Sequence, residues 1–291
     1  MDRRKFVTIM SGTIALGTTG ALSAFTNSLP ETDVLMPVLF VGHGSPMNGI
    51  EDNEFSQYWK KLASEIAKPK AILCISAHWL TRGTFITASE KPATIHDFGG
   101  FSEELFAVEY PAPGNPQLAA ETAEIITKTS VGLDTEWGMD HGTWTILRHM
   151  YPEADIPVLQ LSIDYYQGAQ YHYELAQQLA SLRKKGVLII GSGNMVHNLG
   201  LVAWDRLNEA FGFDWALEIN ELFKTRISDN DHSSLINYFT LHQHIAKAIP
   251  SPDHYFPLIY SLGLKNEKDA VSFFNDQAMA GSLTMTSVRF G

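Results

Sequence analysis

The chain has 291 residues, of which 21 are Lys or Arg and 32 are Asp or Glu, giving a formal net charge of −11. Its 45% hydrophobic and 18% charged residues are typical of a soluble globular protein and exclude a disordered chain. An acidic chain without a basic stripe is repelled by phosphates, so we expect no nucleic acid among its partners. The single cysteine, Cys74, excludes a disulfide framework and any zinc site built from several cysteines. The composition leaves 11 histidines to explain.

Residues 1–30 are typical of a bacterial export signal of the twin-arginine type. Arg3 and Arg4 precede Phe6, residues 9–24 carry no charge, and small residues follow at 21–24. The uncharged stretch is shorter than the ~20 residues that a membrane span needs, so we expect no stable span once the signal is removed. The signal predicts the export machinery as a partner and a periplasmic location, or a cytoplasmic location if the signal is not functional.

The rest of the chain alternates between predicted strands and helices. Short apolar runs predict buried strands at residues 36–41, 71–77, 157–163 and 187–191, and an alternating pattern predicts a last strand at 283–290. Helices are expected at 54–67, 116–128, 143–150 and 170–185, with mainly helical structure from Trp204 to the last strand. This order predicts a single α/β domain over residues 31–291, with a largely parallel sheet covered by helices on both faces.

Three histidines follow predicted strands at the point where each strand ends. His43 comes after the first strand, His78 after the second, and His197 lies just beyond the strand at 187–191. In open α/β sheets the ligand crevice lies outside the carboxyl ends of the strands. Imidazole is a common ligand of iron and zinc, so their convergence would form a metal site. Each histidine taken alone is more typical of a surface or hydrogen-bonded core residue.

Seven ordered motifs then resemble a known family. They are Gly42-His43-Gly44-Ser45-Pro46-Met47, Ser76-Ala77-His78-Trp79, His96-Asp97-Phe98-Gly99-Gly100-Phe101, Tyr110-Pro111-Ala112-Pro113-Gly114, Asp140-His141-Gly142-Thr143-Trp144, Ser192-Gly193-Asn194-Met195-Val196-His197-Asn198 and Asp253-His254-Tyr255. The set resembles the class III (LigB-type) extradiol ring-cleavage dioxygenases, and within them the 4,5-DOPA extradiol dioxygenase group. The resemblance runs from about residue 36 to the end of the chain. It implies three layers, α/β/α, around a mixed sheet.

The resemblance implies metal ligands His43, His78 and His254, with His197 as a fourth ligand or a near neighbour. It also implies an acid–base role for His141, and His197 is the alternative base if it does not bind metal. An all-histidine set departs from the two histidines and one carboxylate expected of non-haem iron oxygenases. We therefore expect one divalent metal per chain, Fe(2+) for dioxygenase activity or Zn(2+) as in similar proteins.

Other residues of these motifs are candidates for contacts with substrate. His96, Trp79 and Trp144 are expected to bind it, and Phe98 is a further candidate for the wall of an aromatic pocket, although buried aromatic residues more often serve packing. Asp140 and Asp253 each precede a site histidine. They are expected either to orient an imidazole or to cap a helix. His149, His172, His232, His242 and His244 lie on polar or helical stretches and are expected to be structural or solvated.

The function implied is that of a non-haem metal-dependent extradiol dioxygenase, which inserts O₂ into a catechol ring and opens it. The substrate would be a small aromatic diol resembling 4,5-DOPA. The alternative is a zinc-binding protein of the same fold with non-redox chemistry or no catalytic activity, because zinc has no redox chemistry of its own.

Overall fold

A six-stranded mixed sheet forms the centre of the computed structural model, which describes residues 29–207 and 209–291. The strand order is β6-β2-β8-β1-β12-β9, and the predicted signal lies outside the described residues except for its last two positions. The first four strands in this order run parallel, and the last two are antiparallel to their neighbours. Their bounds are β6 Val158–Gln160, β2 Ala71–Ser76, β8 Val187–Gly193, β1 Val38–Gly42, β12 Ser287–Phe290 and β9 Val271–Phe274.

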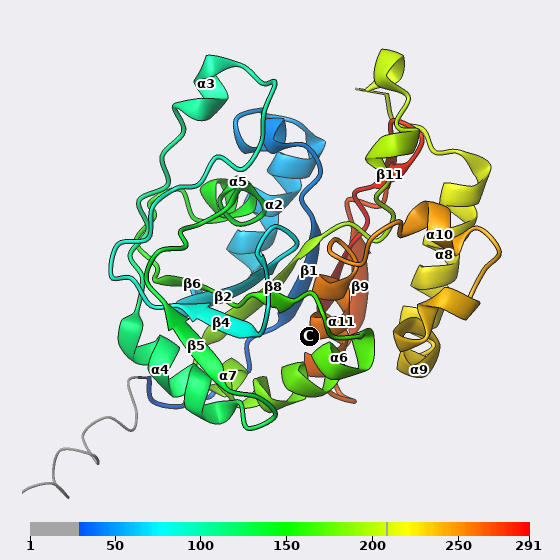
Figure 1. The fold of residues 1–291 in the computed structure, drawn as a ribbon. Coiled ribbons are helices and arrows are strands. Elements are labelled where there is room, and N and C mark those ends of the chain that lie inside the picture. Colours follow the sequence, from blue (N-terminus) through cyan, green and yellow to red (C-terminus); the bar gives the residue numbers. More distant parts are fainter. Residues whose placement is uncertain (1–28, 208) are drawn as a thin grey trace, which may run out of the picture.

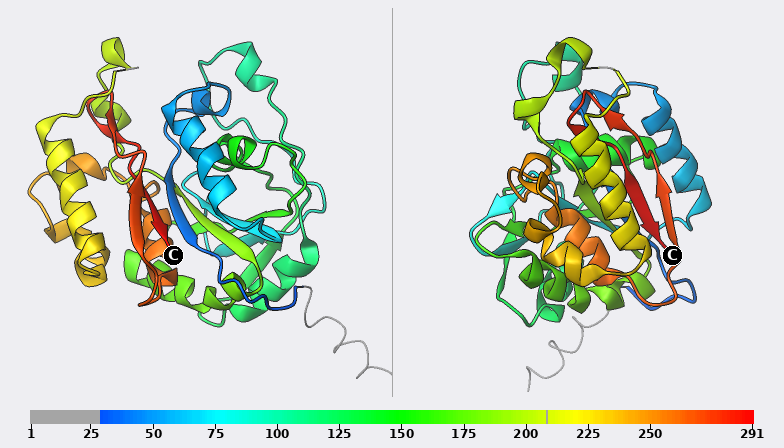
Figure 2. Two further views of the ribbon diagram at one scale, coloured as in Figure 1. Left: turned by 180° about the vertical axis from the view of Figure 1, so that it is seen from behind. Right: turned by 90° about the vertical axis from the view of Figure 1, so that its right-hand side faces the viewer.

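Both faces of the sheet are apolar and both are covered by helices. Along β1, Val38 and Phe40 belong to one core cluster, while Leu39 and Val41 belong to the other. This alternation follows from the two-residue period of a strand, and burial on both faces explains why the strands are continuous apolar runs. The predicted three-layer α/β/α architecture is confirmed, with helices on either side of the sheet in Figures 1 and 2.

The helices divide between the two core clusters. On one face lie α2 (Glu54–Glu65) and α5 (His141–Met150), which pack together. The other cluster contains α4 Pro116–Ile125, α6 Ala169–Gln178, α7 Ala180–Lys184, α8 Asp214–Ser228, α9 His232–Ile236, α10 Ile245–Ala248 and α11 Phe256–Leu264. Shorter elements are α3 Glu103–Phe106, η1 Pro46–Gly49, η2 Leu199–Leu201, η3 Trp204–Arg206 and η4 Tyr238–Thr240. None of the helices among the described residues is long and apolar enough to cross a membrane.

The predicted bounds of three elements are wrong, because in each case the backbone hydrogen bonding is interrupted within the predicted range. The helix expected at 170–185 is interrupted at Leu179, which separates α6 from α7. The strand expected at 157–163 leaves the main sheet after Gln160, and β7 (Ile163–Asp164) pairs instead with β3 (Leu80–Thr81). The last strand divides into β11 (Leu283–Thr284) and β12.

Several short strands were not predicted at all. The edge strand β9 lies inside the segment expected to be mainly helical, and it pairs with β12 over four residues. Three further strands are β4 Thr84–Thr87, β5 Val131–Asp134 and β10 Ala278–Met279. All of these have two to four residues, too few to establish a period in the sequence.

A buried histidine lies between two helices behind the sheet. His172 of α6 is fully buried, its Nδ1 lies 3.0 Å from the Tyr260 hydroxyl of α11, and its ring packs on Phe256. This contact is part of the α6–α11 packing, the most extensive between helices in the described part of the chain. Burial is the main reason that the pKa of His172 falls to about 4.

We predict that His172 makes the fold acid-sensitive. Because its folded pKa lies below the value of ~6.5 in an unfolded chain, the unfolded state binds more protons, and stability is lost as pH falls from about 6.5 towards 4. His172→Gln should remove a loss of about 3 kcal/mol between pH 7 and pH 4. Urea unfolding of both proteins across this range measures the effect, and parallel pH curves would contradict it.

Candidate metal centre

Four histidines meet beyond the carboxyl ends of the parallel strands. The ring centroid of His43 lies 5.0 Å from that of His78, 5.1 Å from that of His254 and 5.4 Å from that of His141. The Nε2 atoms of His43 and His78 are 3.0 Å apart. One ring nitrogen from each of His43, His78 and His141 lies within 4.8 Å of the other two. His197 stacks on His254 with a centroid separation of 3.5 Å, so all five predicted site histidines form one group.

The hydrogen bonds of His43 determine which of its nitrogens carries the proton. Its Nδ1 lies 3.0 Å from the Ser192 hydroxyl, and that hydroxyl donates its only hydrogen to the Gly142 carbonyl at 2.5 Å. Ser192 must therefore accept from Nδ1–H of His43. The Nε2 atom of His43, which faces His78, is left without a hydrogen and is available as a ligand.

One carboxylate holds the next two imidazoles. Asp97 Oδ2 lies 3.2 Å from Nδ1 of His78, and Oδ1 lies 3.0 Å from Nδ1 of His141 and also accepts from the His141 backbone N–H. An ionised carboxylate only accepts, so His141 carries its hydrogen on Nδ1 and keeps Nε2 free, while His78 lies within ion-pair distance of the same carboxylate. Asp97 thus connects a predicted metal ligand with the predicted acid–base residue.

The hydrogen bonds of His254 also determine which of its nitrogens carries the hydrogen. His254 Nδ1 lies 3.3 Å from Oδ1 of Asn194, whose amide group donates to the Thr284 carbonyl. Oδ1 is therefore an acceptor, and the hydrogen of His254 lies on Nδ1. The donor set is thus several neutral imidazoles, and the Nε2 atoms of His43 and His78 are 3.0 Å apart, a separation at which they share a hydrogen or bind one cation. These residues fit a divalent transition metal.

Burial keeps these imidazoles neutral. Burial and the neighbouring histidines lower the pKa of His43 and His254 well below the usual range and that of His78 to about 3. The pKa of His197 falls to about 4, mainly through burial. For Asp97, burial raises the pKa, but the hydrogen bonds from His141 and the charges of His141 and His78 outweigh it and lower the pKa to about 2. Neutral imidazoles beside an ionised carboxylate are the protonation states that bind a metal.

Local structure explains how α5 presents His141. Asp140 is the N-cap of α5, where its buried carboxylate accepts from the Thr143 backbone N–H and also from Ser76 and Gln160. The capping alternative for Asp140 is therefore confirmed. The residue after His141 must be glycine, because a Cβ at Gly142 would lie 2.6 Å from the Ser76 hydroxyl and 2.9 Å from the His78 ring.

The opposite side of the site depends on a close backbone approach. A Cβ at Gly193, the last residue of β8, would lie 2.2 Å from the His254 carbonyl. The next residue, Asn194, donates its backbone N–H to that same carbonyl. Asp253, the other carboxylate expected to orient an imidazole, lies 3.9 Å from His254 Nε2, beyond hydrogen-bond distance.

The residues predicted to contact substrate lie in two different surroundings. His96 donates from Nε2 to the Val108 carbonyl at 3.0 Å, and its ring packs with Phe98 and Trp144. Phe98 also contacts His141 edge-on at 5.6 Å, so this aromatic cluster reaches the histidines. Trp144 is fully buried, and Trp79 is 3% exposed and stacks on Trp137. Their contacts with substrate remain predictions.

Asp97 is the site residue that the sequence reasoning missed. The motif containing it drew attention to His96, its neighbour, because histidine is the more common functional residue. The signal was nevertheless present, since Asp97 is the one carboxylate within that motif. Its contact with two histidines depends on a loop without helix or strand, and no sequence period predicts such a path.

Comparison with known proteins agrees with this geometry. Residues 37–290 match the family described as the catalytic LigB subunit of aromatic ring-opening dioxygenase. The chain is 44% identical over 260 residues to the 4,5-DOPA dioxygenase extradiol of Escherichia coli K12, covering 88% of this chain and 95% of the relative. It is 35% identical over 274 residues to the 4,5-DOPA dioxygenase extradiol of Beta vulgaris, covering 89% and 97%.

A solved structure supports the same assignment. The crystal structure of an uncharacterised Escherichia coli K12 protein matches with a TM-score of 0.76 and 40% identity, covering 88% of this chain and all of the other. The chain belongs to the LigB family of ring-opening dioxygenases. Within this family it is an extradiol ring-cleavage dioxygenase, as the motifs implied.

We predict that Asp97→Asn weakens metal binding. An amide is uncharged, so it weakens the hydrogen bond that orients His141 and removes the electrostatic attraction that holds His78. Loss of such a partner typically costs 10- to 100-fold in metal affinity. Competition between the protein and a chromophoric chelator for Zn(2+) measures this.

The control for this titration is Asp155→Asn, which removes an exposed carboxylate paired with Lys68. It should bind Zn(2+) like the wild type, and Asp97→Glu should recover part of the affinity. An Asp97→Asn protein with wild-type affinity would show that the carboxylate does not hold the ligands.

Proposed function

We propose that this dioxygenase cleaves the ring of a catechol resembling 4,5-DOPA, using one divalent metal held by its histidines. The observation that carries the proposal is a group of imidazoles in which His43, His141 and His254 have Nε2 left free by the hydrogen bond at Nδ1. It lies in a chain whose relatives are named 4,5-DOPA dioxygenases.

Within this proposal, His43, His78 and His254 hold the metal, with His197 a fourth ligand or a near neighbour. Fe(2+) is the metal required for ring cleavage; when bound, it supplies the open coordination positions and redox chemistry that activate O₂ and the catechol. Uncharged imidazole ligands leave the full positive charge of the ion to favour an anionic catecholate. Zn(2+) fits the same nitrogens but lacks redox chemistry, so a zinc-loaded protein should bind catechols without opening them.

We assign acid–base catalysis to His141. Its Nδ1–H is held by Asp97, so the free Nε2 is the atom that takes a proton from a catechol hydroxyl and later returns it. The ionised carboxylate stabilises the imidazolium formed in between, which is the usual role of a carboxylate behind a catalytic histidine. His141 also lies close to His43 and His78, so whether it binds metal is part of the test.

The aromatic residues beside His141 complete the proposed site. Phe98 contacts Phe101 at 5.4 Å and Phe106 at 5.1 Å, and all three belong to the segment that also carries Asp97. These rings would pack against a planar catechol and exclude water from the histidines, which strengthens electrostatic interactions there.

We also propose that residues 1–30 direct export to the periplasm. The support is the Arg3-Arg4 pair, the uncharged stretch after it, and the family match that begins only at residue 37. Replacing both arginines by lysine should retain the protein in the cytoplasm, as measured by cell fractionation. Unchanged export would contradict a twin-arginine route.

The function is tested by loading the metal-free protein anaerobically with Fe(2+) or Zn(2+), adding DOPA or another catechol, and admitting O₂. We expect oxygen uptake and a coloured ring-fission product with Fe(2+) and neither with Zn(2+). No uptake with Fe(2+) across a panel of catechols would exclude the dioxygenase proposal and favour the zinc-binding alternative.

Two variants separate the roles in the same experiment. His43→Ala should lose both metal and oxygen uptake, whereas His141→Ala should keep the metal and lose at least 100-fold in turnover, the usual range for an acid–base residue. Loss of metal from His141→Ala would make it a ligand, and full activity would remove it from the mechanism.

A further inference from the structure

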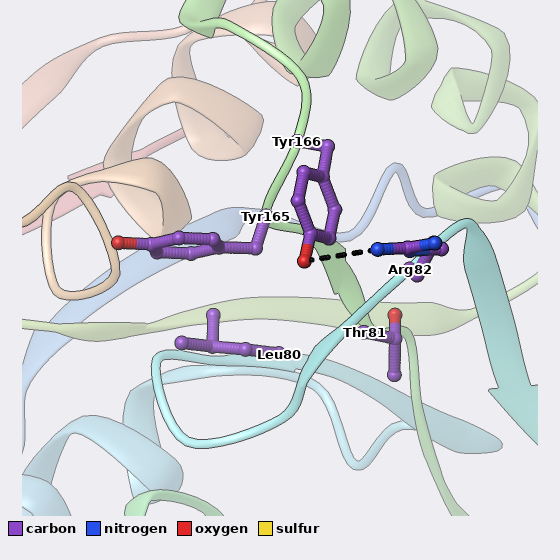
Figure 3. Close-up of a pocket in the computed structure, with 5 residues that line it drawn as sticks. All are labelled: Leu80, Thr81, Arg82, Tyr165 and Tyr166. Atoms are coloured by element: carbon purple, nitrogen blue, oxygen red, sulfur yellow. Dashed lines mark hydrogen bonds between the residues drawn. The ribbon is translucent and has the colours of Figure 1, made fainter.

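A recess lies at the surface, in the segments that follow β2 and β6. It has a volume of about 300 Å³ and is lined by Leu80, Thr81, Arg82, Tyr165 and Tyr166. Figure 3 shows the Arg82 guanidinium and the Tyr166 hydroxyl pointing toward one another, with Tyr165 above Leu80 on the other side. The guanidinium carbon lies 4.8 Å from the Tyr166 ring centroid, and Nη2 lies 3.4 Å from the hydroxyl. The recess thus combines one cation with two aromatic rings.

The backbone fixes this recess on the same edge of the sheet as the histidines. Its two segments are extensions of the neighbouring parallel strands β2 and β6, beyond their carboxyl ends. They are joined by the β3–β7 pairing and by the hydrogen bond from the Tyr165 backbone N–H to the Thr81 carbonyl. Leu80 is only two residues beyond His78. Ligand crevices of open α/β sheets lie along this edge.

Arg82 has no carboxylate partner among the described residues, although the chain has 32 acidic residues and only 21 basic ones. Among the described residues its guanidinium contacts Tyr166, and a hydroxyl and a ring face leave most of its five N–H donors free. A guanidinium with free N–H groups can bind a carboxylate through two parallel hydrogen bonds. In a chain of net charge −11, an anionic ligand needs such a local cation to bind.

We propose that Arg82, between Tyr165 and Tyr166, binds the carboxylate of the catechol substrate and gives the enzyme its preference for acidic catechols. This inference rests on the proposed function, which supplies the catechol at the histidines. The guanidinium pairs with the carboxylate, and the tyrosine rings cover the aliphatic part of the substrate side chain. Neutral catechols gain nothing from the recess.

The test compares two catechols that differ in the carboxylate, 3,4-dihydroxyphenylpropionate and 4-ethylcatechol. In oxygen-uptake assays of the iron-loaded enzyme, Arg82→Gln should raise KM for the acid about tenfold with kcat unchanged, the size expected for one charge-assisted hydrogen-bonded pair. KM for 4-ethylcatechol should stay the same. Arg82→Lys should recover part of the preference, because it keeps the charge but loses the bidentate geometry.

The matched control is Lys268→Gln, which removes one positive charge from an exposed position elsewhere. It should leave both KM values unchanged. Equal changes for the two catechols in Arg82→Gln, or no change for either, would overturn the proposal.

Calorimetric binding of both catechols to the zinc-loaded protein under argon separates this inference from the proposed function. If the wild type consumes no O₂ with any catechol, the dioxygenase proposal fails, and the binding preference still decides the role of Arg82. A wild-type preference for the acid that disappears in Arg82→Gln supports the recess. Equal affinities in the wild type overturn it.

Discussion

The arrangement of the site depends on one carboxylate shared between two imidazoles. One oxygen of Asp97 lies 3.2 Å from Nδ1 of His78, and the other accepts from Nδ1 of His141, which fixes the tautomer of that ring and leaves its Nε2 with a free lone pair. Ser192 and Asn194 do the same for His43 and His254. Because Nδ1 of His43, His141 and His254 is occupied on the protein side, the Nε2 lone pairs of these rings are available to a cation. The hydrogen bonds behind the histidines thus specify a metal site as much as the histidines do.

The sequence predicted the positions of strands and histidines correctly where an apolar run is followed by a histidine. The strands β1, β2 and β8 are long enough to show their burial, and the rule for carboxyl ends of parallel strands placed His43 and His78 on one rim. His141 and His254 follow no strand of the main sheet. Only the resemblance to a family linked them to the site.

The errors have a physical origin in short elements and in loops. Leu179 interrupts a helical pattern without glycine or proline, and β9 is a four-residue edge strand. Asp97 lies in the stretch between β4 and α3, where no regular element sets the direction of side chains. The recess at Arg82 could not be predicted either, because it also depends on Tyr165 and Tyr166, which lie far from Arg82 in the sequence.

The spacing of the histidines along the chain has a consequence for folding. The predicted ligands, from position 43 to position 254, meet only when the parallel strands and α11 are all in place. Such contacts have high sequence separation, so they form late and at a large cost in loop-closure entropy. A bound ion would act as a cross-link between the first and last thirds of the fold, and it would oppose unfolding in proportion to its affinity. Metal content is therefore a measure of completed folding as well as of catalytic competence.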